Sequence, residues 1–276
     1  MKRLGLLILV LSLGKCTEAT SKSNSSALAA LVLGQGTVSA SGSTQRNPLR
    51  EEMADTVVSA PANTGVEYRN SANAVNGVRG GGLNAGSLDV FSLDQTGSGA
   101  SIVLSWKDKT IYNGTGIDFI VFENPFRAGS DPNSIFLEAI IVEVSEDNTN
   151  YCGFAPSYTH SSPTSFSRNP AHWQNFAGKT PVLYHDETNR LTGDSLWDTA
   201  QTGGDGFDLD NLSDSNTFNT GCSSTVKNSI QTNGFKYLKL TAASARTNPN
   251  TGSAFPVDSG AFDGPDIDGV LGRYRK

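Results

Sequence analysis

Aspartates two residues apart mark the places where this sequence could carry out chemistry. Two runs contain them, residues 205–210 and 263–269, and both have an Asp-x-Asp core. In an extended segment, residues two apart face the same side, so Asp266 and Asp268 should point together. Two like charges at that spacing repel each other unless a cation or hydrogen-bond donors compensate them. Ca²⁺, which takes about 6–8 oxygen ligands, is the natural cation in an exported protein.

The aspartate runs therefore predict a calcium site. Its predicted ligands are Asp266 and Asp268, together with Asp118 and Glu123 from another strongly patterned string. Neither run fits an EF-hand, because the required Gly and the distal Glu are missing. The alternative is a solvated turn in which the aspartates bond to their own backbone. Paired carboxylates also serve glycoside hydrolysis, but the sequence does not fix their separation.

Other catalytic motifs are absent or incomplete in the sequence. There is no Gly-x-Ser-x-Gly elbow, and residues 224–227 match Ser-x-x-Lys without its partner motifs. His160, His172 and His185 form no His-Glu-x-x-His pair. Residues 80–85 match a dinucleotide-binding fingerprint but lack the preceding strand and the following helix. These observations favour a protein that is not an enzyme.

The chain begins like an exported lipoprotein. A basic start precedes an apolar run over residues 4–13, which is typical of a signal peptide. The run is too short to cross a bilayer as a helix, which takes roughly 20 apolar residues. Residues 13–16 (LGKC) resemble a lipobox, although a small residue is usual where the lysine stands.

We therefore predict that the signal peptide, residues 1–15, is removed and that Cys16 is acylated, with palmitate among the chains. Two or three acyl chains give stable anchoring, whereas a single chain binds a membrane only marginally. The alternative is an ordinary secretory signal with a chance cysteine. If Cys16 is acylated, Cys152 and Cys222 remain as a candidate disulfide pair in an oxidising compartment. The alternative for these two is a pair of free, buried thiols.

The net charge of the chain bears on which classes of partner it can bind. The formal net charge is −6 and becomes −9 when the three basic residues of the signal peptide are removed. A net negative chain with no basic cluster is a poor candidate for nucleic acid or for an anionic membrane surface. We predict contact with the membrane through the lipid anchor and no nucleic-acid partner.

Short apolar runs separated by Gly, Asn, Asp and Pro predict an all-β domain over residues 55–276, preceded by an acylated cysteine and flexible tether over residues 16–54. No stretch shows a sustained helical period with caps, so long helices are not expected. The predicted strands cover residues 56–59, 88–93, 101–106, 117–122, 135–144, 181–184 and 235–241.

Residues 145–234 are predicted to form elaborated loops at one end of a β-sandwich. Long loops in a compact domain are uncommon and usually functional. This region contains Trp173, Phe176 and Trp197. Exposed aromatic rings would stack on a sugar or anchor a protein partner, which makes Trp173 and Trp197 candidate binding residues. The alternative is that the rings fill a satellite core beneath the loops.

Four strings taken together resemble a known family: residues 97–104, 114–124 (GTGIDFIVFEN), 142–147 (VEVSED) and 266–270 (DIDGV). They resemble a widespread family of secreted bacterial cell-surface proteins and are most like its spirochaetal outer-surface lipoprotein branch. The resemblance covers about residues 74–271. It implies a jelly-roll-like antiparallel β-sandwich. The long loops after Cys152 depart from the family pattern, so a ligand surface there would not be shared with the family.

Three functional hypotheses follow. The first is an outer-membrane lipoprotein, exposed at the cell surface, that acts as a non-enzymatic, adhesin-like binding module for host matrix or plasma proteins or for glycans. The second is a calcium-assisted, glycan-active enzyme that uses carboxylates among Glu123, Asp266 and Asp268. The third is a periplasm-facing structural lipoprotein. The sequence favours the first, although no residue reports on which side of the membrane the domain lies.

Overall fold

The computed structural model describes residues 49–214, 221–261 and 263–276. The predicted signal peptide, Cys16 and the predicted tether up to residue 48 lie outside the described residues. The chain divides into two compact units, residues 1–45 and 46–276, and all described residues belong to the second. No helix in the described ranges is both long enough and apolar enough to cross a membrane.

The second unit is β-rich, with few helices, as the short alternating runs predict. Its α-helices are α2 (Thr199–Thr202) and α3 (Ser224–Asn233). Short 3₁₀ helices occupy Glu67–Arg69, Ser71–Val75, Ser98–Ala100, Pro170–His172, Gly193–Trp197, Leu209–Asn211 and Ala243–Ala245. The strands are β1 (Thr56–Ser59), β2 (Phe91–Ser92), β3 (Ser101–Ser105), β4 (Phe119–Phe122), β5 (Phe126–Arg127), β6 (Ile135–Phe136), β7 (Ile140–Ser145), β8 (Cys152–Gly153), β9 (Ser157–Tyr158), β10 (Trp173–Gln174), β11 (Asp205–Phe207), β12 (Tyr237–Ala242), β13 (Asp266–Ile267) and β14 (Gly269–Gly272).

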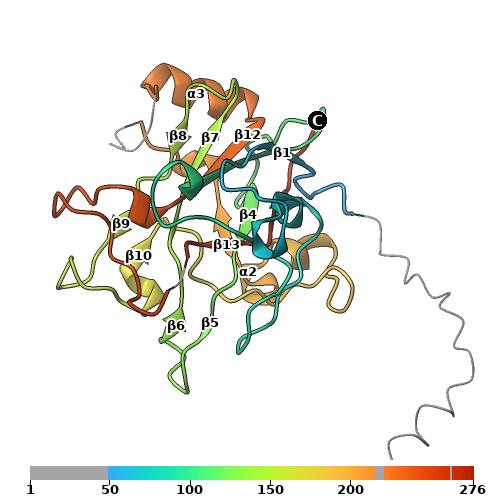
Figure 1. The fold of residues 1–276 in the computed structure, drawn as a ribbon. Helices are drawn as coiled ribbons and strands as arrows, with labels where there is room; N and C mark the ends of the chain where they lie inside the picture. The colour runs from blue at the N-terminus through green and yellow to red at the C-terminus, as the bar shows by residue number, and fades with distance from the viewer. Residues whose placement is uncertain (1–48, 215–220, 262) are drawn as a thin grey trace, which may run out of the picture. The chain divides into compact units, whose positions relative to one another are not determined.

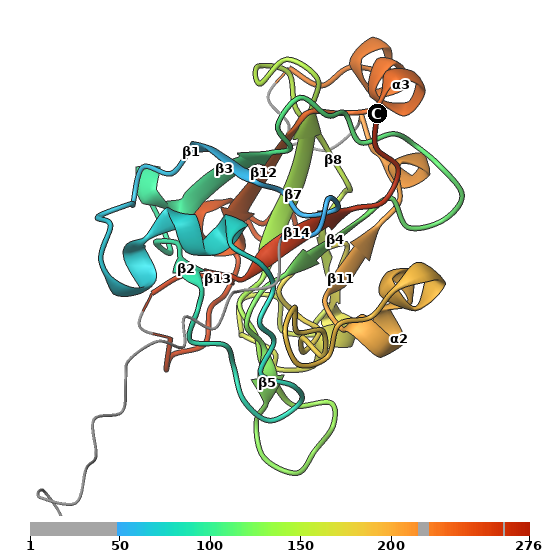
Figure 2. The same ribbon diagram turned by 90° about the vertical axis from the view of Figure 1, so that its right-hand side faces the viewer.

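The strands pair in antiparallel sheets (Figures 1 and 2). The larger sheet has five strands in the order β1-β3-β12-β7-β8, and the second has three in the order β11-β4-β14. Three further two-stranded sheets pair β9 with β10, β2 with β13, and β5 with β6. Apart from β7 with β8, neighbours in the two larger sheets are far apart in sequence, so their pairing is mostly long-range.

One hydrophobic core takes residues from both larger sheets. Ile102 and Leu104 of β3 are fully buried in it, as are Phe119 and Val121 of β4. The alternation predicted for residues 101–106 is confirmed over residues 101–104, because Ser101 and Val103 of the opposite face are only half-buried, but Ser105 of that face is buried. Burying a side chain of this size stabilises the fold by about 1.5–3 kcal/mol.

Three strand predictions need correction. The run over residues 135–144 is not one strand, because residues 137–139 separate β6 from β7. In the predicted strand 88–93 only β2 is paired as a strand. Residues 181–184 form no strand and contribute a single bridge from Val182 to Gly203. Apolar content indicates burial in each case, but backbone pairing also requires a free neighbouring edge.

The longest described helix, α3, lies within the region predicted as loops. It is capped at its start by Ser223, whose hydroxyl accepts a hydrogen bond from the amide of Val226. Gly234 follows its end with a φ of 83°, a conformation that glycine adopts without strain. Only Ile230 is fully buried, so the helix has no strong apolar stripe. Its two caps were the sequence signal for it.

The folded unit begins earlier than the predicted boundary at residue 55. Met53 and Ala54 are 1% and 0% exposed. The backbone of Met53 bridges to Leu271, and the amide of Ala54 donates to the carbonyl of Val270 at 2.9 Å. This segment therefore lies against β14 rather than in the tether, which overturns the predicted extent of the tether up to residue 54.

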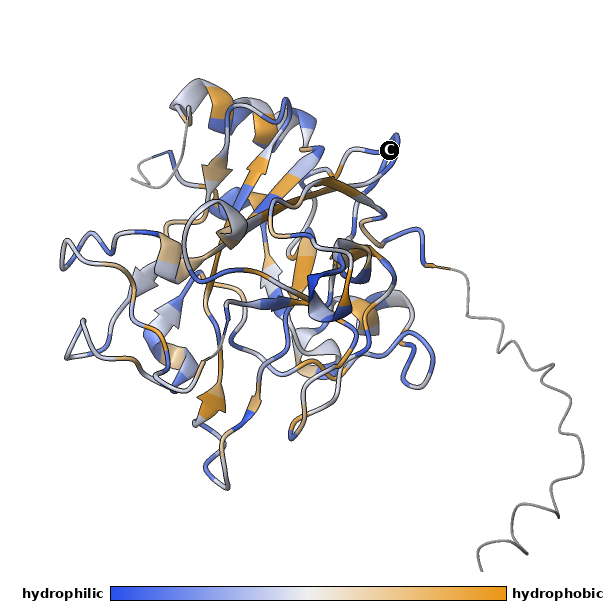
Figure 3. Ribbon diagram, in the orientation of Figure 1, coloured by the Kyte–Doolittle hydropathy of each residue, from blue (hydrophilic) through white to orange (hydrophobic). Residues whose placement is uncertain are grey.

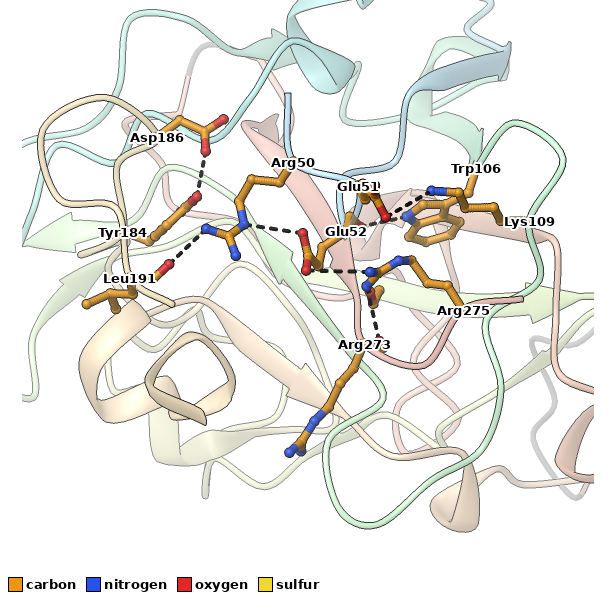
Figure 4. A network of polar contacts seen from close by, with 11 residues as sticks. Arg50, Glu51, Glu52, Trp106, Lys109, Tyr184, Asp186, Leu191, Arg273 and Arg275 are labelled. Atoms are coloured by element: carbon orange, nitrogen blue, oxygen red, sulfur yellow. Dashed lines mark hydrogen bonds and ion pairs between the residues drawn. The ribbon is translucent and has the colours of Figure 1, made fainter. Parts of the chain in front are cut away.

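Charged side chains hold the same segment from the other side (Figure 4). The Glu52 carboxylate pairs with Arg50 at 3.3 Å and with Arg275 at 3.5 Å. The indole N–H of Trp106 donates to the Glu52 carbonyl at 2.8 Å, and the Arg50 guanidinium donates to the Leu191 carbonyl at 2.8 Å. Apart from the pair of Arg50 with Glu52, these contacts are long-range in sequence, which is why local composition did not reveal them.

A disulfide joins Cys152 of β8 to Cys222, just before α3, as the cysteine count predicts. The two residues are 70 apart in sequence, and their Cα atoms are 5.0 Å apart. Cys152 is fully buried in the main core, whereas Cys222 packs against that core from a half-buried position. The bond therefore ties the edge strand of the larger sheet to the start of the helix.

Candidate functional site

A pocket of about 220 Å³ lies where the end of β4, the β5–β6 pair and the start of β13 meet. The described residues that line it include five carboxylic side chains and no lysine, arginine or histidine. Figure 3 shows β6 as a hydrophobic strand beside β5, which together form one wall of this pocket. We call it the acid-aromatic pocket, after its carboxylic side chains Glu123, Glu138, Asp258, Asp263 and Asp266 and its rings Phe126 and Phe136.

Glu123 is the most buried acid of the pocket. It directly follows the fully buried strand β4, which fixes its backbone inside the fold. Its side chain is 3% exposed, and its Oε1 accepts a hydrogen bond from the Asp266 amide at 3.0 Å. Its Oε2 has no hydrogen-bond partner among the described residues. Burial raises the pKa of Glu123 well above its ordinary value, and the negative charges of Glu138 and Asp266 raise it further.

Glu138 lies in the break between β6 and β7. Burial raises its pKa to about 8, with smaller contributions from the negative charges of Asp266, Asp263 and Asp258. Its carboxyl group has no hydrogen bond or ion pair with the described part of the chain. A glutamic acid of this kind keeps its proton at neutral pH and releases it when a cation arrives.

Asp266 opens β13 opposite Ser92 of β2. It accepts hydrogen bonds from the Ser92 hydroxyl and from the side-chain amide of Asn124, the latter at 3.3 Å. Burial raises its pKa, although the Ser92 and Asn124 bonds oppose the shift. Glu123, which follows β4, and Asp266, which begins β13, are thus held together in the pocket.

The other two acids of the pocket have arginine partners. Asp258 accepts from the Arg168 guanidinium at 2.8 Å, and Asp263 lies 3.8 Å from Arg69. Arg168 also stands over the ring of Phe136 at 4.2 Å from its centroid. The charges of Asp258 and Asp263 are therefore compensated locally.

Two phenylalanines form the aromatic wall. The rings of Phe126 and Phe136 are 5.1 Å apart between centroids, on the paired strands β5 and β6. Phe136 is 39% exposed. Aromatic faces attract cations and pack against the C–H faces of sugars. The pocket therefore combines hydrogen-bond acceptors with a partly apolar wall, which suits a cationic or hydroxyl-rich ligand.

The predicted calcium ligands are not gathered into one metal centre. Among the described residues, no group of three or more His, Cys, Asp or Glu is arranged to hold a metal ion. Glu123 and Asp266 do meet in the acid-aromatic pocket, but Asp118 and Asp268 have other partners. Asp268 is fully buried and both of its oxygens accept from the Arg79 amide at 3.0 Å. Burial raises its pKa to about 8.

Asp266 and Asp268 have different partners because the chain changes sheet between them. Asp266 belongs to the pair of β13 with β2, whereas residue 269 already begins β14 in the three-stranded sheet. The backbone amide of Asp268 donates to the Phe122 carbonyl at 3.0 Å, which places it at this junction. The period-two expectation holds only along a continuous strand.

Asp118 has a structural role in the patterned string. Its two carboxylate oxygens accept from the Gly114 amide at 2.8 Å and from the Leu209 amide at 2.7 Å. Burial raises its pKa to about 6. It thereby ties the turn before β4 to the segment after β11. Gly116, with a φ of 77°, takes a left-handed conformation in that turn, which accounts for its place in the string.

Trp173, one of the two candidate binding residues, is fully buried, and that assignment is wrong. It belongs to a satellite core with Tyr158, Phe176 and Phe255, and its indole N–H donates to the Ser167 carbonyl at 2.8 Å. The loops around it cover the ring because an exposed indole of this size would leave a large apolar surface in water.

Trp197 is half-buried at the end of a 3₁₀ helix. Its ring packs against a further hydrophobic cluster that contains Ile120, Phe122 and Leu196, and it lies 5.7 Å from the Arg273 guanidinium. It does not line the acid-aromatic pocket. Trp197 therefore remains a separate surface position.

Glu138, Phe126 and Phe136 were not among the predicted site residues. The prediction of one continuous strand over residues 135–144 concealed Glu138, which lies in the break between β6 and β7. A single charged residue inside an otherwise apolar run was the signal that could have found it, because a charge is rarely buried without a partner.

Comparisons of this chain with protein-family models, with curated proteins and with solved structures find no match. The family resemblance carried by the four sequence strings therefore stays a prediction. The site has to be interpreted from its own geometry.

Proposed function

We propose that this chain is a surface-exposed outer-membrane lipoprotein whose acid-aromatic pocket makes it a non-enzymatic, adhesin-like binding module. Its ligands would be host matrix or plasma proteins, or glycans. We further propose that its two larger antiparallel sheets form a jelly-roll-like sandwich, with the β5–β6 pair extending from it as part of the binding surface. The shared core of the two sheets supports the sandwich.

The observation that carries this proposal is a pocket in which one oxygen of Glu123 and the carboxyl group of Glu138 have no partner among the described residues. Protein interiors normally provide a partner for each buried polar group. Glu123 Oε2 has none among the described residues, and Glu138 forms no described ion pair. Keeping such groups beside an exposed aromatic ring costs stability, which favours a ligand that supplies the missing donors.

Cys16→Ala should release the protein from the membrane fraction. Without the thiol no diacylglycerol can be attached, and an unacylated chain with a negative charge has little affinity for a membrane. Metabolic labelling with an alkynyl fatty acid, followed by fractionation, measures both effects. A Ser substitution elsewhere in the tether, Thr17→Ser, is the control and should label normally. Equal labelling of the Cys16→Ala chain would overturn the lipoprotein assignment.

Cells that display the protein should adhere to immobilised matrix proteins, plasma proteins or glycans, and the acid-aromatic pocket should be required. We expect Glu123→Gln/Glu138→Gln to reduce adhesion at least fivefold, because the amides cannot carry the negative charge. Glu51→Gln, on an 82% exposed side chain, is the matched control. Adhesion assays on intact cells, with protease accessibility measured in parallel, provide the test.

The outcomes of that experiment separate the hypotheses. Protease protection on intact cells would favour the periplasm-facing structural lipoprotein. Protease sensitivity without adhesion to any surface would contradict the binding function. Adhesion that is unchanged in the double variant would place the binding surface outside the pocket.

A glycan-active enzyme is the second candidate, because Glu123 and Asp266 meet in one pocket as the enzyme hypothesis requires. A buried carboxylic acid with a raised pKa beside a second carboxylate is the arrangement used to protonate a leaving group. Calcium would assist this hydrolysis only if ligands other than the acids of the acid-aromatic pocket complete its coordination. Release of reducing ends from glycans by the purified protein, lost in Glu123→Gln, would favour this candidate over pure binding.

A further inference from the structure

We infer that the acid-aromatic pocket takes the basic side chain of a lysine or arginine presented by a partner protein. This inference rests on the proposed binding function and names the ligand class of its site. The pocket offers three carboxyl groups without an ion-pair partner among the described residues, an unused buried acceptor and an aromatic wall.

The charge balance of the pocket is incomplete. Asp258 and Asp263 pair with arginines at the rim. Glu123, Glu138 and Asp266 take part in none of the ion pairs found among the described residues. A ligand with a positive charge would favour the ionised form of these acids and pair with it, whereas an anionic ligand would disfavour it.

Glu123 directs the choice toward a hydrogen-bond donor. The side chain is 3% exposed and lines the pocket, and its Oε2 has no partner among the described residues. An ammonium group has three donors and a guanidinium has five, and neither has an acceptor. Either group could donate to Glu123 Oε2 and to the Glu138 carboxylate at the same time.

The aromatic wall favours an organic cation over a metal ion. Phe136 is 39% exposed, and its ring already has the Arg168 guanidinium 4.2 Å from its centroid. The volume of about 220 Å³ is far larger than a single ion needs. The aliphatic stem of a lysine or arginine would pack on Phe126 and Leu137 while its charged end reaches the acids.

The surroundings of the pocket fit a protein rather than a free amine. Val257, next to the acidic lining, is 41% exposed, and Leu83 is 38% exposed. Leu83 lies beside the pocket wall because its carbonyl accepts from the amide of Arg127 in β5 at 2.8 Å. Apolar residues around a central charged anchor are typical of a protein interface.

The test uses the full chain purified in mild detergent at pH 8.5, above the pKa of about 8 of Glu138. Nα-acetyl-lysine methylamide and Nα-acetyl-arginine methylamide are titrated separately and followed by NMR chemical shifts. Nα-acetyl-norleucine methylamide and Nα-acetyl-citrulline methylamide are their neutral controls. Calcium chloride is titrated in a third series.

We expect saturable binding of at least one cationic probe, with affinity at least tenfold higher than that of its neutral control. The shifts should centre on Phe136 and Glu138. Glu123→Gln/Glu138→Gln should weaken binding at least tenfold, and Glu51→Gln should not change it. If the double variant does not fold, Glu138→Gln alone should still weaken binding at least threefold, because Glu138 makes no internal hydrogen bond.

Equal binding of the cationic and neutral probes would overturn the inference, as would calcium binding that excludes both cations. The two cationic probes show whether lysine or arginine is the source. If displaying cells adhere through the pocket but neither cation binds or competes, the inference fails while the binding function stands. If a cation binds but cells adhere to nothing, the proposed adhesin function fails instead.

Discussion

Removing the disulfide should lower the free energy of unfolding by about 4 kcal/mol. The bond closes a loop of 70 residues, and the entropy that such a crosslink removes from the unfolded chain has about this value. For a unit of this size, 4 kcal/mol corresponds to a melting temperature lower by roughly 8–16 °C. Urea unfolding of Cys152→Ala/Cys222→Ala against the oxidised chain measures the difference.

A second comparison separates the crosslink from packing. Cys152 is fully buried in the main core, so its replacement by Ala also removes a buried sulfur atom. Wild-type chain unfolded in dithiothreitol keeps both side chains and loses only the bond. We expect most of the decrease in the free energy of unfolding both in the double Ala variant and in the reduced wild-type chain. A loss below about 1 kcal/mol in dithiothreitol would mean that the unfolded chain is already constrained without the bond.

The sequence predicted the strands whose side chains alternate or are uniformly buried. β3 and β4 lie within predicted runs and β12 extends one residue beyond its run, because each has one or two faces in the core and their residue types report burial directly. The shorter strands β9 and β10 were not predicted. Two-residue strands have no period to detect, and their pairing is set by tertiary contacts.

Boundaries were less predictable than elements. Met53 and Ala54 were assigned to the tether because the residues before them are polar, yet both pack against β14. Only the fold shows that a free position beside β14 was available. In the same way, the helix α3 has caps but little apolar surface, so periodicity alone could not distinguish it from a loop.

The site was predicted in part for a related reason. Glu123 and Asp266, which are 143 residues apart, were singled out from separate strings. The structure joins them by a hydrogen bond from the backbone amide of Asp266 to the carboxyl group of Glu123. Asp118 and Asp268 carry the same pattern in the sequence but use their carboxylates to hold backbone amides. A carboxylate that binds the chain and one that awaits a ligand look alike until their partners are known.

The folded protein should lose stability as the pH rises from 5 to 8. Glu138 has a pKa of about 8 in the folded chain against an ordinary value of 4.5, and Asp268 is also raised to about 8. Because each pKa is raised on folding, the folded state binds more protons than the unfolded state in this range. The stabilisation is complete below the ordinary pKa and is lost as the pH passes the raised one.

The expected loss between pH 5 and pH 8 is about 3–4 kcal/mol for each of these two groups and about 7 kcal/mol for both, since one unit of pKa displacement corresponds to about 1.4 kcal/mol. The melting temperature should then fall by roughly 14–28 °C. Calorimetry of the full chain at several pH values measures the slope. Glu123→Gln/Glu138→Gln should make it less steep, because neither amide titrates while Asp268 still does, whereas the exposed control Glu51→Gln should leave it unchanged. A profile that rises toward pH 8 would show that the acids of the pocket already have a compensating charge in the folded protein, and it would remove the electrostatic basis for a cationic ligand.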